Sequence, residues 1–73
     1  SETVQNNGKM RRERIFPVPI EVKPEGKTEM FAHFRTSHSD TNDPRMHYYV
    51  DTHLTHKAYI GYIGTHLTNT KTN

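Results

Sequence analysis

Residues that could cleave RNA without a metal lie on one short stretch of this sequence. Glu29, His33 and Arg35 are spaced by even numbers, so they share one face of an extended strand. Such cleavage needs a base for the 2′-hydroxyl proton, an acid for the leaving oxygen and a cation for the phosphorane. These groups predict a metal-independent ribonuclease with Glu29 or His33 as base and Arg35 on the phosphate. His66 or His47 would be its acid.

The same face carries aromatic rings, which allows binding without catalysis. Phe31 lies on the same strand face as Arg35. Tyr49 lies with His47 on the matching face of the stretch 45–53. Rings beside cations form a stacking platform in sheet-type binders of single strands. The leading hypothesis is therefore a small binding module for single-stranded nucleic acid, with bases on Phe31 and Tyr49 and phosphates on cationic side chains. Besides Arg35, those cations are Lys9, Arg11, Arg12 and Arg14.

A zinc site is a third interpretation of the histidines. His53 and His56 have the spacing of a ligand pair, and Asp51 and His47 could complete the set with oxygen and nitrogen. Residues three apart on a strand face opposite sides, however, and the helical HExxH pattern is absent. We therefore expect neither a metal nor another cofactor.

Solvation is the simplest explanation of the polar face. Ionisable residues are normally on the outside, and pairs of opposite charge across strands stabilise a sheet modestly. Phe31 and Tyr49 would then pack against the polar loop Ser37–Pro44. The sequence leaves these explanations open.

Size and composition limit the fold to one small domain. The chain has 73 residues, 30% of them hydrophobic, and no cysteine, so neither disulfides nor thiolate ligands are available. Its net charge of +2 is matched by a local excess of +2 at the N-terminus. We expect a flexible basic arm over residues 1–14, a β domain over residues 15–67 and a polar tail over residues 68–73.

Four stretches have the period of β-strands and position the ionisable residues. Ile15–Val22 contains two prolines in one register, which predicts an edge strand. The turn Lys23–Lys27 predicts an antiparallel hairpin with a second strand over Thr28–Thr36. Arg45–His53 and Ala58–Ile63 complete a small all-β fold, an antiparallel meander of about four strands that could curl into a half-barrel. No helix of useful length is expected, and residues 10–14 are expected to be irregular.

The fourth strand, Ala58–Ile63, has apolar or aromatic residues on both faces. Such strands are usually central or covered on both sides, and Gly61 and Gly64 indicate a bulge or a close backbone approach. Nothing else in the sequence is an obvious cover. This predicts a third function class, a protein-interaction or assembly module that pairs with itself or with a larger protein.

The sequence contains no feature of a membrane or secreted protein. There is no signal-peptide pattern, and no apolar run approaches the roughly 20 residues that span a bilayer. We therefore expect a soluble, cytoplasmic protein without a membrane partner.

Overall fold

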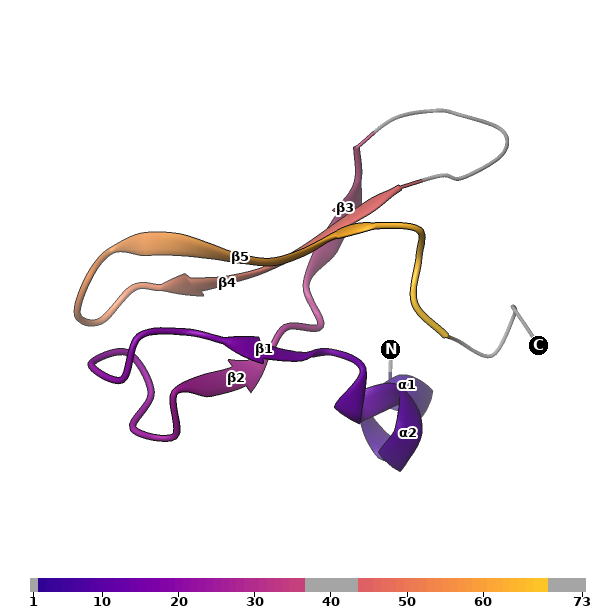
Figure 1. The fold of residues 1–73 in the computed structure, drawn as a ribbon, viewed down its shortest axis with the longest axis horizontal. Helices are drawn as coiled ribbons and strands as arrows, with labels where there is room; N and C mark the ends of the chain where they lie inside the picture. The colour runs from indigo at the N-terminus through magenta and orange to yellow at the C-terminus, as the bar shows by residue number, and fades with distance from the viewer. Residues whose placement is uncertain (1, 37–43, 69–73) are drawn as a thin grey trace.

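The computed structural model describes residues 2–36 and 44–68, which form two short helices and five strands. The helices are α1 (Glu2–Asn6) and α2 (Gly8–Arg12), and the strands are β1 (Ile15–Pro17), β2 (Lys27–Glu29), β3 (His33–Arg35), β4 (Arg45–Asp51) and β5 (Lys57–Gly64). β1 and β2 form a two-stranded antiparallel hairpin, which lies against one face of the antiparallel sheet β3–β4–β5 (Figure 1). The expected all-β antiparallel fold is confirmed, with five strands. The predicted loop 37–44 and tail 68–73 lie outside the described residues, apart from Pro44 and Thr68.

The first hairpin forms as predicted, although β1 is shorter than expected. β1 ends at Pro17, since proline has no amide to donate and the chain then turns, with the Val22 amide donating to the Pro19 carbonyl at 2.9 Å. The tight turn closes where the Gly26 amide donates to the Lys23 carbonyl at 2.8 Å. Gly26 has φ +75°, a left-handed conformation that glycine adopts without strain.

The expected single strand over Thr28–Thr36 is wrong, because the chain leaves one sheet and enters the other in the middle of it. β2 ends at Glu29 and β3 begins at His33. Between them Met30 is 0% exposed, and its amide donates to the Arg14 carbonyl at 2.7 Å. Burial of this side chain between the two sheets outweighs the continuity of the alternating pattern.

β5 is an edge strand of its sheet, which corrects the expectation that it is central. The glycine prediction is confirmed: Gly61 is the extra residue of a bulge, since Tyr62 pairs with His47 while Ile60 pairs with Tyr48. A Cβ at Gly61 would lie 2.6 Å from Met30 Sδ and from Phe16 Cβ. The backbone of β5 therefore touches the core directly.

The N-terminus is helical rather than irregular. Asn7 caps α2, because its Oδ1 accepts a hydrogen bond from the Met10 amide at 3.0 Å. Glu13 then accepts hydrogen bonds from the amide and the hydroxyl of Thr68, each at 3.0 Å, so the segment after α2 is tied to the segment after β5. Both helices have five residues, and within residues 2–36 and 44–68 no helix is long and apolar enough to cross a membrane.

Candidate functional site

The sheet β3–β4–β5 sorts its side chains into an inner face toward the hairpin and an outer face toward solvent. Cross-strand pairing places Phe34 beside Met46, Tyr48 beside Ile60 and Val50 beside Ala58. The outer face consists of seven uncharged side chains: Phe34, Met46, Tyr48, Val50, Ala58, Ile60 and Ile63. Because they occupy three neighbouring strands, they form one continuous apolar surface.

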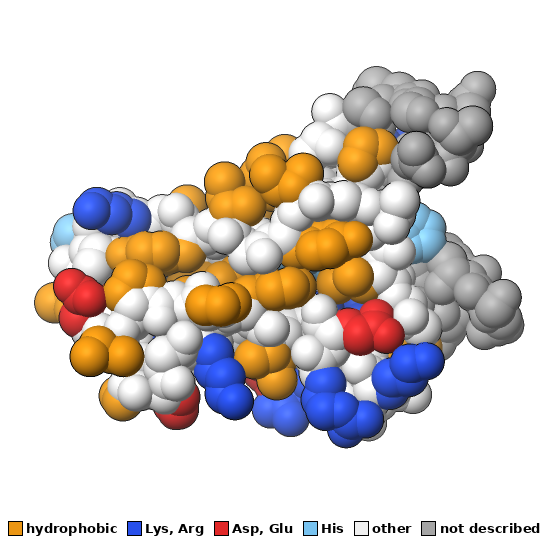
Figure 2. Space-filling view, viewed as in Figure 1, with side chains coloured by type: hydrophobic (Ala, Val, Ile, Leu, Met, Phe, Trp, Pro, Cys, Tyr) orange, Lys and Arg blue, Asp and Glu red, His pale blue; other side chains and the backbone are white. Residues whose placement is uncertain are grey.

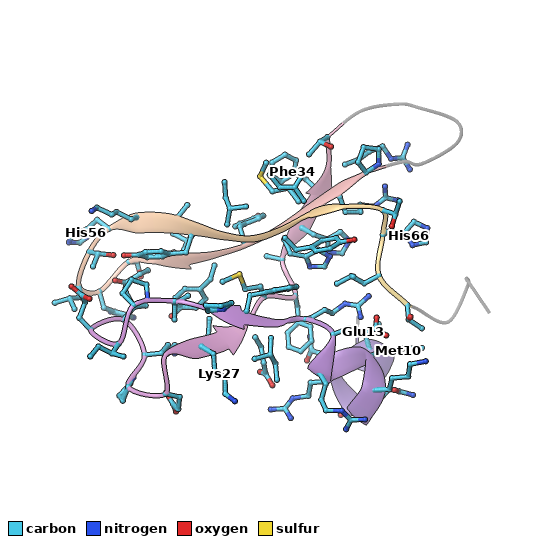
Figure 3. The ribbon with its side chains drawn as sticks, viewed as in Figure 1. Met10, Glu13, Lys27, Phe34, His56 and His66 are labelled. Atoms are coloured by element: carbon cyan, nitrogen blue, oxygen red, sulfur yellow. The ribbon has the colours of Figure 1, made fainter. Side chains whose placement is uncertain are left out.

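Four side chains of this outer face are about half exposed, while Met46 and Tyr48 are partly buried. Phe34 is 50% exposed, Val50 49%, Ile60 56% and Ile63 59%. Figure 2 shows hydrophobic side chains gathered along the upper side of the molecule, where Phe34 points away from the hairpin (Figure 3). Scattered exposed apolar residues are ordinary, whereas the largest contiguous apolar patch on a monomer is often functional.

The bulge at Gly61 keeps the outer face apolar along the whole of β5. Strict alternation after Ile60 would turn Tyr62 to the outer face and Ile63 to the inner one. The additional residue reverses this, so Tyr62 stacks on Phe16 of the hairpin at 5.9 Å between ring centroids. Ile63 is thereby added to the outer face.

The inner face carries the ionisable residues that the sequence analysis placed toward solvent. His47 is 1% exposed, and its Nδ1–H donates to the Met30 carbonyl at 2.8 Å, which fixes the proton on Nδ1 because a carbonyl can only accept. Burial lowers the pKa of His47; the Met30 hydrogen bond raises it in part, and the nearby charges of His33, Arg14 and Arg45 lower it again. The predicted assignment of faces is therefore inverted.

Asp51 organises the turn between β4 and β5. Its carboxylate accepts hydrogen bonds from the amides of His53, Leu54 and Thr55 and from the Thr55 hydroxyl at 2.7–3.3 Å. The Thr55 bonds are the main cause that lowers the pKa of Asp51 to about 2. In the described part of the chain no three His, Cys, Asp or Glu side chains group to hold a metal.

The structure brings together only part of the set predicted for ribonuclease chemistry. His33 and His47 are stacked, with ring centroids 4.7 Å apart. Glu29 lies in the other sheet and forms an ion pair with Arg11. Arg35 ends β3 opposite Arg45, and His66 follows β5, where its Nδ1 donates to the Leu67 carbonyl at 3.3 Å.

The residues predicted to bind nucleic acid are likewise divided between different parts of the fold. Phe31 lies in the connection between the sheets and is half buried. Tyr49 is on the inner face, with Lys23 Nζ 5.3 Å from its ring centroid. Arg14 is 6% exposed and donates to the Met10 and Thr68 carbonyls, each at 2.8 Å. Three of the predicted cations remain exposed on α2: Lys9, Arg11 and Arg12.

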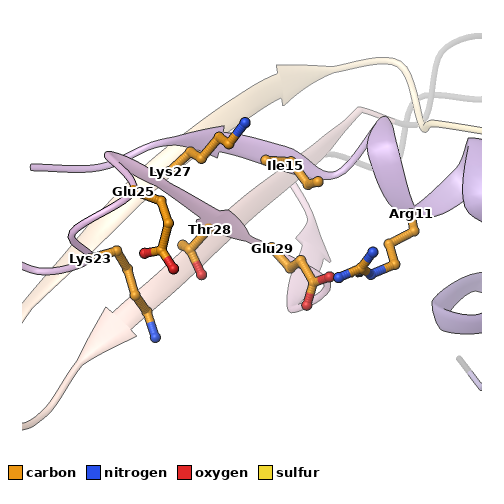
Figure 4. Close-up of a pocket in the computed structure, with 7 residues that line it drawn as sticks. All are labelled: Arg11, Ile15, Lys23, Glu25, Lys27, Thr28 and Glu29. Atoms are coloured by element: carbon orange, nitrogen blue, oxygen red, sulfur yellow. Dashed lines mark ion pairs between the residues drawn. The ribbon is translucent and has the colours of Figure 1, made fainter. Parts of the chain in front are cut away.

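A pocket of about 260 Å³ lies between α2 and the hairpin (Figure 4). Its lining contains three cations and two carboxylates besides Ile15 and Thr28: Arg11, Lys23, Lys27, Glu25 and Glu29. At the edge of the pocket, Arg11 and Glu29 form an ion pair, which neutralises one positive and one negative charge. The mixed charges favour no single class of ligand, so the pocket supports no functional assignment.

Alternation along residues 45–53 separates Met46, Tyr48 and Val50 from His47 and Tyr49, but it does not show which side is exposed. For Ala58–Ile63 the sequence predicts apolar or aromatic residues on both faces and no division between them. No signal in those strands shows which face a second layer covers.

Comparisons with protein-family models, with curated proteins and with solved structures find no match for this chain. Its function must therefore be argued from its own surfaces and side-chain chemistry.

Proposed function

We propose that this chain is an assembly module whose outer face packs against the outer face of a second copy. The observation that carries the proposal is the continuous, uncharged and exposed surface on β3, β4 and β5. A surface without charges is complementary to itself, so a two-fold arrangement brings apolar side chains together and places no like charges opposite each other. Two such sheets can stack about 10 Å apart, as in a sandwich.

Because the core is small, packing of a second copy against the outer face would stabilise the fold. Among the described residues, the buried hydrophobic side chains are those of Val4, Val18 and Met30. A small domain buries a limited fraction of its surface and is marginally stable on its own. Covering the outer face would give the sheet apolar contacts on both sides.

The size of the face predicts a weak and reversible dimer. β4 and β5 pair over seven residues and β3 adds three, so with strands about 4.8 Å apart and about 3.3 Å per residue the face covers roughly 270 Å². That area is near the lower end of the roughly 300–600 Å² of the largest patches on monomers. Interfaces this small belong to transient complexes, so dissociation on dilution is expected.

Sedimentation velocity over a range of concentrations tests the proposal. Ile60→Lys places a charge in the outer face and should leave a monomer at every concentration, while the unaltered chain becomes dimeric as its concentration rises. Ile20→Lys is the matched control, because Ile20 is 73% exposed and lies in the turn after β1, away from the outer face. A strictly monomeric unaltered chain, or equal association of all three, would contradict the proposal.

A second candidate function is binding of single-stranded nucleic acid by the cations of α2. Figure 2 shows Lys and Arg side chains along the lower edge of the molecule, where Lys27 lies below the hairpin (Figure 3). Contacts to phosphates release counterions, so RNA binding that falls steeply with salt would support this function. Lys9→Gln with Arg12→Gln should weaken such binding, and binding that ignores both salt and these substitutions would contradict it.

A further inference from the structure

His47 holds the hairpin and the sheet together at the centre of the molecule. Its Nδ1–H bond to the Met30 carbonyl joins β4 to the residue that follows β2. Its ring also lies against Phe16 of β1, at 6.3 Å between centroids, and edge-on to Tyr62 of β5, at 5.9 Å. One imidazole therefore contacts both layers of the fold.

The surroundings of His47 disfavour a positive charge on its own ring. His33 of β3 is stacked on it, and the charges of Arg14, from the segment after α2, and of Arg45, on β4, also act against its protonation. The side chains that face His47 from β1 and β5 are Phe16 and Tyr62. Neither has a carboxylate that could neutralise a protonated imidazole. The Glu29 carboxylate, the charged group of β2 next to Met30, is paired with Arg11.

We infer that His47 is an acid-sensitive latch, and that its protonation releases the β1–β2 hairpin from the sheet β3–β4–β5. A protonated His47 would keep its Nδ1–H donor but would be a buried charge among cations, with no anion beside it in the described part of the chain. Separation of the layers lets water solvate that charge. Since the hairpin packs on the inner face, the inference does not depend on the proposed contact of the outer face.

The direction of the pH effect follows from the lowered pKa. A histidine that is harder to protonate in the folded chain stabilises the fold fully above its ordinary pKa of 6.5. That contribution is lost as the pH falls through the folded-state pKa. The latch is therefore closed at pH 7 and opens on acidification below pH 6.5, exposing Phe16, Met30 and Tyr62.

Proton NMR of the full chain between pH 7.5 and 4.5 tests the latch. The His47 ring signal should titrate with a midpoint below 6.5, and the nuclear Overhauser contacts between Phe16 and Tyr62 should disappear over the same range. His47→Gln retains an N–H donor but cannot gain a proton, so these contacts should persist in it to pH 4.5. His53→Gln is the matched control and should open as the unaltered chain does.

A second variant keeps the test decisive if His47→Gln does not fold. His33→Phe preserves a ring against His47 and removes one neighbouring positive charge, so it should raise the pKa of His47 and move opening to lower pH. The latch is overturned if the layers stay packed while His47 is charged. It is equally overturned if opening is unchanged in His47→Gln or in His33→Phe.

Discussion

His33 and His47 lie directly opposite each other on β3 and β4, with ring centroids 4.7 Å apart and planes 24° from parallel. The two imidazoles differ in their surroundings: His33 is exposed and donates from Nδ1 to the Phe31 carbonyl at 2.8 Å, whereas His47 is buried. Two histidines that share a sheet face therefore have different roles. Substitutions elsewhere in the fold test how the rest of the structure supports this arrangement.

Gly61→Ala should destabilise the fold by about 1–3 kcal/mol, the usual cost of adding a methyl group to a packed core. The new Cβ would lie 2.6 Å from Met30 Sδ and Phe16 Cβ, and the backbone there cannot move away without breaking the bulge. Urea unfolding measures the change. Gly8→Ala is the control with little expected cost, because its nearest neighbour is Arg12 Nη1, at 3.1 Å and at the end of an exposed side chain.

Asp51→Asn should remove an acid-dependent part of the stability. Since hydrogen bonding holds the pKa of Asp51 at about 2, against an ordinary 3.8, its stabilising contribution is present above pH 3.8 and is lost as the pH falls toward 2. Urea midpoints of the variant should lie below those of the unaltered chain at pH 7. The two should converge toward pH 2, and a constant difference across this range would disprove the assignment.

Arg14→Met should destabilise the fold by about 1–3 kcal/mol, the range for losing buried hydrogen bonds made by a charged group. The guanidinium joins the Met10 and Thr68 carbonyls, so its loss should also leave the Thr68 region less protected in hydrogen exchange. Arg12→Met is the exposed control. Equal urea midpoints for both variants would contradict a structural role of Arg14.

Self-association through the outer face should make thermal stability depend on concentration. A partner that binds only the folded chain raises Tm by mass action, so Tm should increase with protein concentration. Calorimetry of Val50→Lys should lose this dependence, because Val50 lies on the outer face and is 49% exposed. Glu21→Lys, on the turn after β1, should keep it.

The turn Lys23–Lys27 and the strands β4 and β5 could be predicted from the sequence, because turn residues and alternation act locally. Gly26 closes the turn with its left-handed φ, whereas β1 ends at Pro17 and not at Val22 as expected. The break at Met30 could not be predicted, since the alternation of residues 28–36 is uninterrupted and the break arises from packing between two layers. The capping by Asn7 has a local signal, because asparagine just before the helical residues is a preferred N-cap.

The candidate site was predicted in composition but not in orientation. Alternation shows that His47 and Asp51 share one face and that Tyr48 and Val50 share the other. Which face is covered depends on where the hairpin docks, and here the Met30 carbonyl offers His47 an acceptor that compensates for its burial. A polar residue with a backbone partner can occupy the interior while aliphatic residues remain outside.

The bulge at Gly61 also lets β5 hold one residue more than β4 without exchanging core and surface. Deleting Gly61 would join Ile60 to Tyr62 in strict alternation, so Tyr62 would still face the hairpin and Ile63 the solvent, and the pairing of Lys57–Ile60 would stay as it is. Regular pairing with Gly61 still present would instead turn Tyr62 toward solvent and Ile63 toward the hairpin. The bulge at Gly61 therefore determines which later side chains of β5 face the hairpin and which face solvent.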